Sequence, residues 1–121
     1  MIIVVFEVEL RPEGRDDYFA LAADLREELK EIDGFISIER FQSLNDPGKI
    51  LSLSTWRDEA AVEAWYRHRG HARAQREGRA RIFRDYRIRV ASVLRDYDMA
   101  SGRMASAALL AEDGSPRAGG L

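Results

Sequence analysis

The order in which two hydrophobic periods follow one another along the chain constrains its fold most. Around Val4–Leu10 apolar side chains recur at every second residue, as in a strand with one buried face. From Arg15 to Ile32 they recur three and four residues apart, which predicts an amphipathic helix. Strand-like segments return over residues 35–43 and 50–56. The first half of the chain therefore reads as strand, helix, strand, strand.

Turn and capping residues separate these segments. Residues 45–48, with the sequence Asn-Asp-Pro-Gly, predict a tight turn that joins the second and third strands into a hairpin. Gly34 is typical of the residue that ends a helix. Asp58 is a typical N-cap for a second helix, which we expect from Glu59 to about Tyr66.

The C-terminal third is less regular. Gly70 interrupts the second helix, and a further helical piece is expected from about His71 to Phe83. Alternation returns over residues 86–92, which predicts the last strand. Beyond Tyr97 no hydrophobic periodicity remains, and glycine, serine and proline are frequent. We therefore expect residues 1–97 to form one domain and residues 98–121 a flexible tail.

The order β-α-β-β-α-β predicts an α+β protein of the ferredoxin-like type, with an antiparallel sheet and both helices on one face. The first and last strands are then antiparallel neighbours, and Glu7 and Glu9 should lie near Arg87 and Arg89. The helix-free face of the sheet needs a cover. We therefore expect a homodimer that pairs through this face.

Charge is unevenly distributed, although the formal net charge is only −2. Residues 7–33 carry ten acidic and four basic side chains, and residues 67–89 carry nine arginines and two acids. The asymmetry is compatible with an anionic ligand, or with two halves that neutralise each other within the fold or across a dimer. Nucleic acid is not expected as a partner, because the acidic half would repel phosphates and no aromatic-basic reader motif is present.

Other features of the sequence limit the cellular compartment in which we expect the protein. The chain has no cysteine, which excludes disulfides and thiolate chemistry and fits a reducing compartment. No apolar run approaches the roughly 20 residues that cross a bilayer. Residues 1–7 lack the basic lead and cleavage site of a secretory signal. The sequence therefore predicts a cytoplasmic protein without a membrane partner.

Four stretches resemble one known family. Residues 34–41, the hairpin end and helix start over 54–61, Trp65, and residues 71–75 are similar to the antibiotic biosynthesis monooxygenases, and the resemblance covers roughly residues 2–97. It implies a ferredoxin-like fold that pairs sheet to sheet as a dimeric α/β barrel, with a pocket between the helices and the sheet. Some members oxidise anthrones to quinones with O2 and without metal or flavin. Others bind haem and open its ring.

The quinone-forming members carry an Asn, a Trp, a Tyr and an Arg at positions that the resemblance maps onto this chain. These positions hold Ser52, Trp56, Val62 and Arg76. The Trp and the Arg are kept. The hydroxyl of Ser52 retains the ability to bond a substrate oxygen, whereas Val62 has no polar group.

The haem-degrading members carry a strand Asn, a helix Trp and a His ten residues later. Here the Trp is Trp65, Gln75 takes the place of the His, and Phe6 or Glu7 takes the place of the Asn. An amide is a poor iron ligand compared with imidazole. His71 lies one helical turn before Gln75 and is the side chain that could ligate a haem iron instead.

Candidate site residues follow from this resemblance and from their chemistry. His71 is the expected general base, because imidazole titrates near neutrality. An arginine can hold a phenolate, a carboxylate or an oxyanion. The catalytic candidates are His71, Arg76 and Trp56, and the substrate-binding candidates are Trp65, Ser52, Tyr86 and Phe6.

Five of these candidates also have a structural interpretation. His71 and Arg76 are compatible with solvent-exposed helix positions, and Trp56, Trp65 and Tyr86 with core packing. His68, between two arginines, is expected in solvent. The spacing of His, Asp and Glu predicts no metal site.

The sequence thus predicts a cofactor-independent, monooxygenase-like homodimer that oxidises a small planar phenolic or quinol-type substrate with O2. Two alternatives stay open. One is a haem-binding or haem-degrading protein, and the other is a ligand-binding or stress-response dimer without turnover.

Overall fold

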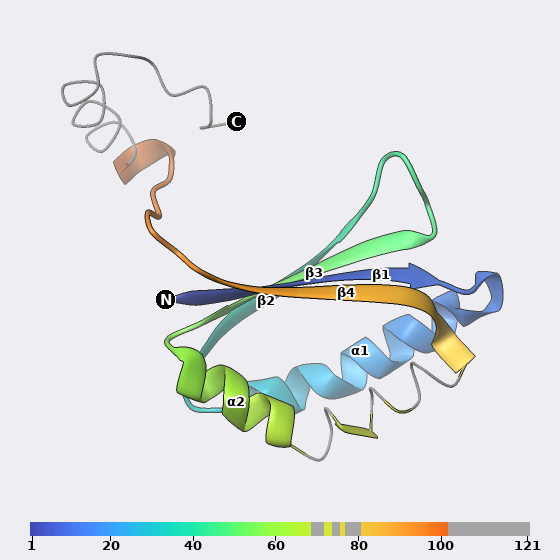
Figure 1. The fold of residues 1–121 in the computed structure, drawn as a ribbon, viewed down its shortest axis with the longest axis horizontal. Helices are drawn as coiled ribbons and strands as arrows, with labels where there is room; N and C mark the ends of the chain where they lie inside the picture. Colours follow the sequence, from blue (N-terminus) through green and yellow to red (C-terminus); the bar gives the residue numbers. More distant parts are fainter. Residues whose placement is uncertain (69–71, 74–75, 77–80, 102–121) are drawn as a thin grey trace.

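The computed structural model describes residues 1–68, 72, 73, 76 and 81–101, and these form one sheet with helices packed against it (Figure 1). The elements in chain order are β1 (Ile2–Leu10), the short 3-10 helix η1 (Pro12–Gly14), α1 (Arg15–Lys30), β2 (Phe35–Gln42), β3 (Lys49–Trp56), α2 (Glu59–Arg67) and β4 (Phe83–Ser92).

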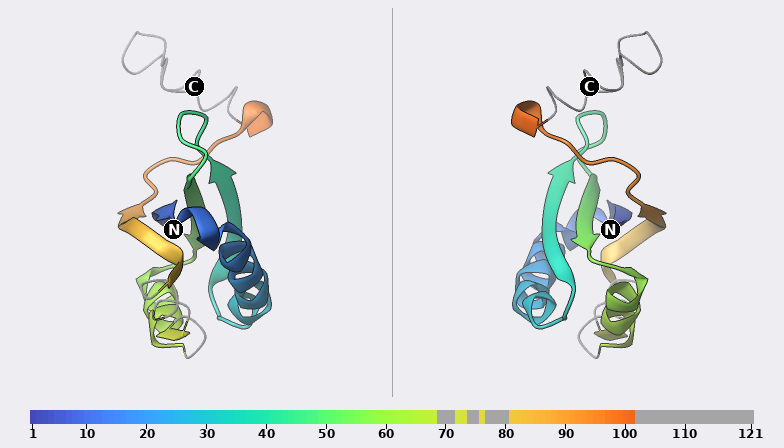
Figure 2. Two further views of the ribbon diagram at one scale, coloured as in Figure 1. Left: turned by 90° about the vertical axis from the view of Figure 1, so that its right-hand side faces the viewer. Right: turned by 90° about the vertical axis from the view of Figure 1, so that its left-hand side faces the viewer.

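The four strands form an antiparallel sheet in the order β2-β3-β1-β4. Both α1 and α2 lie on the same side of this sheet, α1 beneath the β2 edge and α2 beneath the β4 edge (Figures 1 and 2). The predicted ferredoxin-like α+β fold is therefore confirmed. No helix in the described part of the chain is long and apolar enough to span a bilayer.

The predicted turn and capping residues act as expected. The Asp58 side chain accepts a hydrogen bond from the Ala61 N–H at 2.9 Å and so caps α2. In the hairpin turn the Asp46 carboxylate accepts from the Gly48 N–H at 2.9 Å. Gly34 has a φ of 92°, and a Cβ there would lie 2.7 Å from the Cβ of Ala61. Only glycine lets the chain turn from α1 into β2 this close to α2.

The last strand begins earlier than the alternation predicts. β4 starts at Phe83, which the sequence assigned to the end of a helical piece. The cause is a β-bulge, because the register slips from Glu9↔Asp85 to Leu10↔Phe83 and leaves Arg84 as the extra residue. The bulge reverses the parity of the alternation, so Phe83 is buried on the helix side and the strand pattern is broken there. Most of the predicted helical piece over 71–83 lies outside the described residues, as does the predicted tail except for 98–101.

Acidic and basic halves of the chain meet across the fold. Glu7 pairs with Arg89 at 3.3 Å, Glu9 with Arg84 at 3.3 Å, and Asp17 with Arg81 at 2.8 Å. These contacts confirm neutralisation within the fold. Arg87 lies opposite Glu7 in the register of β1 and β4, as expected, while Glu9 pairs with Arg84 at the bulge. The pairs are exposed and contribute little to stability individually.

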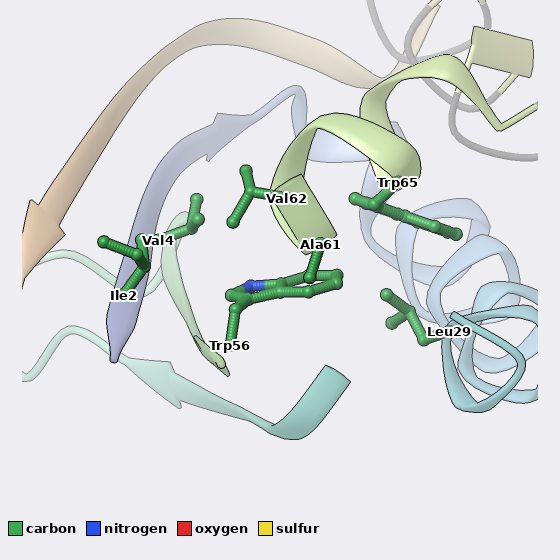
Figure 3. Close-up of a cluster of buried hydrophobic side chains, with 7 residues drawn as sticks. All are labelled: Ile2, Val4, Leu29, Trp56, Ala61, Val62 and Trp65. Carbon is green, nitrogen blue, oxygen red and sulfur yellow. The ribbon is translucent and has the colours of Figure 1, made fainter. Parts of the chain in front are cut away.

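The core has two centres. One surrounds Trp56, which lies between the sheet and α2 with Ala61 and Val62 above it and Leu29 and Trp65 nearby (Figure 3). The other joins β1, α1 and the start of β4. Its buried members are Val8, Leu10, Tyr18, Ile50, Ile82 and Phe83. A cavity adjoins both centres.

Candidate functional site

The floor of the cavity consists of two neighbouring rows of side chains that cross the sheet. The cavity has a volume of about 130 Å³. Residues paired in the strand register stand side by side on one face. The first row is Arg40, Ser52, Phe6 and Ile88, and the second is Ile38, Ser54 and Val4.

The helices supply the opposite wall, and this wall is almost entirely apolar. Its side chains are Tyr18, Leu21, Ala22, Leu25 and Leu29 from α1, and Val62, Trp65 and Tyr66 from α2. The apolar stripe that the sequence shows on α1 thus has two tasks, since it packs against the sheet and encloses the cavity.

Trp56 lines the cavity from the end of β3 and is 1% exposed. Its indole Nε1 donates to the Ser54 hydroxyl at 2.9 Å, and its ring meets Phe35 edge to face at 5.2 Å. The side chain extends beneath Ala61 at the start of α2 (Figure 3). Trp56 is therefore both a core residue and part of the cavity surface.

Trp65 and Tyr66 approach the cavity from α2. Trp65 is buried, and the His68 ring stacks on it at a centroid distance of 5.4 Å. Burial raises the pKa of the Tyr66 phenol above its ordinary value. Tyr66 therefore stays neutral near pH 7, where it can donate a hydrogen bond.

Polar groups gather at one end of the first row. The Arg40 Nε donates to the Tyr18 hydroxyl at 3.3 Å, and Ser52 lies opposite Arg40 in the register of β2 and β3. Tyr18 and Ser52 are buried, with exposed fractions of 5% and 6%. Arg40 is the only ionised side chain among the described residues that line the cavity.

The structure brings four of the seven predicted site residues to this cavity, namely Phe6, Ser52, Trp56 and Trp65. Tyr86 packs against Phe6 and Phe83, at ring distances of 5.8 and 6.0 Å, beside the described lining residues. Arg76 is exposed, and His71 lies outside the described residues.

Sequence reasoning missed Tyr18 and Arg40 as site residues. Tyr18 was hidden within the apolar stripe of its helix. Arg40 shares the parity of Ile38, so it stands on the inward face of β2, where a cation is unusual. Ile36 is skipped between Phe35↔Trp56 and Ser37↔Thr55, and this bulge makes the inward positions of β2 hard to assign from sequence.

The described residues contain no group of three or more His, Cys, Asp or Glu side chains that could hold a metal ion. The lining residues among them likewise include no imidazole for a haem iron. Phenol, hydroxyl and guanidinium groups supply the polar chemistry of the described cavity, and all three donate hydrogen bonds.

The structure is that of a ferredoxin-like α+β protein with a cavity between its helices and its sheet. Residues 1–77 match the family model of the antibiotic biosynthesis monooxygenases. The chain belongs to this family.

A curated relative illustrates the similarity in sequence. The protein named jasmonate monooxygenase ABM, from Pyricularia oryzae strain 70-15, is 45% identical over 93 residues, which are 77% of this chain. The match spans 43% of that relative's length.

Solved structures share the fold. A putative antibiotic biosynthesis monooxygenase from Deinococcus radiodurans has a TM-score of 0.74 at 16% identity, covering 82% of this chain and 98% of its own. A point mutant of SnoaB, a cofactor-independent oxygenase from Streptomyces nogalater, has a TM-score of 0.69 at 10% identity, covering 78% and 94%. At these identities the likeness concerns the fold.

Proposed function

We propose that this protein is a monooxygenase that oxidises a small, mainly apolar, ring-bearing substrate with O2 inside the cavity. The main observation that supports this proposal is the cavity, whose apolar walls surround a few hydrogen-bond donors at one end. Membership of a monooxygenase family and a relative named for that activity support the assignment.

A planar phenolic or quinol-type substrate is the first class to test, because it needs no external reductant. An activated methylene that becomes a ketone supplies all four electrons that O2 requires. One oxygen atom enters the new carbonyl group, and the other leaves as water with the two methylene hydrogens. The protein must then remove a proton, exclude water and hold the substrate oxygen on which charge develops. Within this proposal His71 is the base.

The proposal includes a homodimer formed through the helix-free face of the sheet. Val5 and Leu53 are register partners, and each alternates with residues that line the cavity. They therefore point away from the helices. α1 and α2 both lie on the opposite side of the sheet (Figure 2). A second sheet packed there would bury this apolar face.

A matched pair of substitutions on α1 tests the site. Ala22 lines the cavity and its neighbour Ala23 is exposed. Oxygen uptake is measured with anthrone-type and jasmonate substrates. Ala22→Leu fills part of the cavity and should lower the uptake rate roughly tenfold or more, because pockets discriminate by single methylene groups. Ala23→Leu should leave the rate unchanged, and thermal unfolding of both variants controls for folding.

Three other results would contradict this function. Equal rates in the two variants would place the reaction elsewhere. Saturable binding of the same compounds without oxygen uptake would favour the ligand-binding dimer. A stoichiometric Soret band on adding haem, which decays under ascorbate, would favour haem degradation, for which the described lining residues offer no imidazole.

A further inference from the structure

We infer that Arg40, Tyr18 and Ser52 form a carboxylate-binding site at one end of the cavity, and that the protein binds an apolar, ring-bearing monocarboxylate. This inference deepens the proposed function and rests on it, because it takes the occupant of the cavity to be the substrate. It concerns the part of the ligand that is held rather than the part that reacts.

The first argument is the unused hydrogen-bonding capacity of Arg40. Its guanidinium has five N–H donors, and the only hydrogen bond that it makes to a described residue is from Nε to Tyr18. No carboxylate of the described residues lies within 4.0 Å of it. Arg40 is only partly buried, and no charge of a described residue compensates its guanidinium. The Nη1 and Nη2 edge is therefore left for a ligand.

The second argument is the character of the neighbouring groups. Tyr18 accepts a bond from Arg40, so its own O–H proton is available to a ligand oxygen. The Ser52 hydroxyl faces Arg40 across the register and makes no hydrogen bond to a described residue. Both groups line the same cavity as Arg40. Three kinds of donor with no acidic neighbour suit an acceptor that carries negative charge.

The third argument selects the class of anion. One cation compensates one negative charge, and the two parallel N–H bonds of a guanidinium edge match the two oxygens of a carboxylate. The remaining walls are aliphatic and aromatic, so the rest of the ligand must be apolar. A phosphate would bring a second charge and a third oxygen for which the described lining offers no second cation.

The first experiment uses the unaltered protein. Calorimetric titrations compare cyclohexylacetate and 1-naphthylacetate with their neutral amides, which have nearly the same shape. We expect each carboxylate to bind at least tenfold more tightly than its amide, since charge-assisted hydrogen bonds are roughly twice as strong as neutral ones. Equal affinities, or no binding of either carboxylate, would overturn the inference.

The second experiment assigns the preference to Arg40. Arg40→Gln should reduce carboxylate affinity roughly 10- to 100-fold and leave amide affinity unchanged. Arg40→Lys keeps the charge but loses the two parallel N–H donors. Its carboxylate affinity should lie between those of the wild type and Arg40→Gln. Arg26→Gln on the exposed side of α1 removes the same charge away from the cavity and should change neither affinity. If Arg26→Gln weakened carboxylate binding as much as Arg40→Gln, general charge rather than this site would explain the preference.

The two proposals fail separately. A carboxylate preference that depends on Arg40, found without any oxygen uptake, would keep the binding site and remove the monooxygenase assignment. Oxygen uptake on neutral phenols, together with equal affinities for each carboxylate and its amide, would keep the monooxygenase assignment and remove the carboxylate site.

Discussion

Two serines on the floor of the cavity differ in what their hydroxyls contact. Ser52 and Ser54 both face the helices from β3, and each has an exposed fraction of 6%. Only Ser54 has a described partner, the buried Nε1 of Trp56 at 2.9 Å. Substituting each serine in turn therefore distinguishes the loss of a hydroxyl from the loss of the acceptor of a buried N–H donor.

We predict that Ser54→Ala lowers the free energy of unfolding by about 1–3 kcal/mol, because it leaves the Trp56 N–H buried without an acceptor. Ser52→Ala, the matched control, should cost less than about 1 kcal/mol. Urea unfolding at one fixed protein concentration measures both, with an unchanged m value as a check. Equal losses for the two variants would mean that the indole bond does not contribute to stability.

At this scale the sequence anticipated the cavity only in part. Phe6, Ser52, Trp56 and Trp65 were named because family positions and residue chemistry pointed to them, and they line the cavity. Arg40 was not named, because the direction in which a strand residue points depends on register. A single bulge before it moves every later side chain to the other face.

Among the elements, α2 depends on one side chain for its first turn. The backbone N–H of Ala61, and next to it the Arg57 guanidinium, hold the pKa of Asp58 below its ordinary value of 3.8. An acid whose pKa is lowered by folding stabilises the folded state above its unfolded pKa. That stabilisation is lost as the pH falls through the folded pKa.

We predict that Asp58→Asn makes stability less sensitive to acid. Asn still caps the helix but does not ionise, so the fall in Tm between about pH 5 and pH 2 should be smaller than in the wild type. Asp33 shares Arg57 and also has a lowered pKa, so some acid sensitivity should remain. Thermal unfolding at several pH values measures the effect.

The control is Asp24→Asn, which alters an exposed aspartate of α1 that makes no hydrogen bond to a described residue. It should reproduce the wild-type pH dependence. A fall in Tm that is the same in wild type, Asp58→Asn and Asp24→Asn would assign the acid sensitivity to other groups.

Element order and most boundaries could be predicted, because hydrophobic period, turn chemistry and capping residues agree with one another over β1, α1 and the hairpin. The start of β4 could not be predicted in this way. Its bulge at Arg84 is defined by pairing with β1, which is distant in sequence, and the local pattern around Phe83 is helical in spacing. Non-local pairing rather than local propensity decides that boundary.

The whole molecule has two unlike sheet faces. The helix side is filled by the core and the cavity. On the other side Ile3, Val5, Leu51 and Leu53 form an apolar strip that is only half-buried, bordered by the Glu7 pairs with Lys49 and Arg89. Phe41 on the adjoining β2 is 45% exposed. A contiguous apolar patch with a charged border is typical of an interface between subunits.

We predict that the purified protein has twice the mass of the chain in light scattering, and that Leu53→Arg converts it to a monomer. The new charge would lie opposite Val5 at the centre of the strip, where sheet-on-sheet packing leaves it without water or a partner. Ala23→Arg on the exposed side of α1 adds the same charge away from the strip and should leave the dimer intact. Because the cavity is on the other face, a monomeric Leu53→Arg variant that still unfolds cooperatively should retain part of its ligand binding. A Leu53→Arg protein that stays dimeric would mean that the subunits meet through another surface and that the strip needs a different cover.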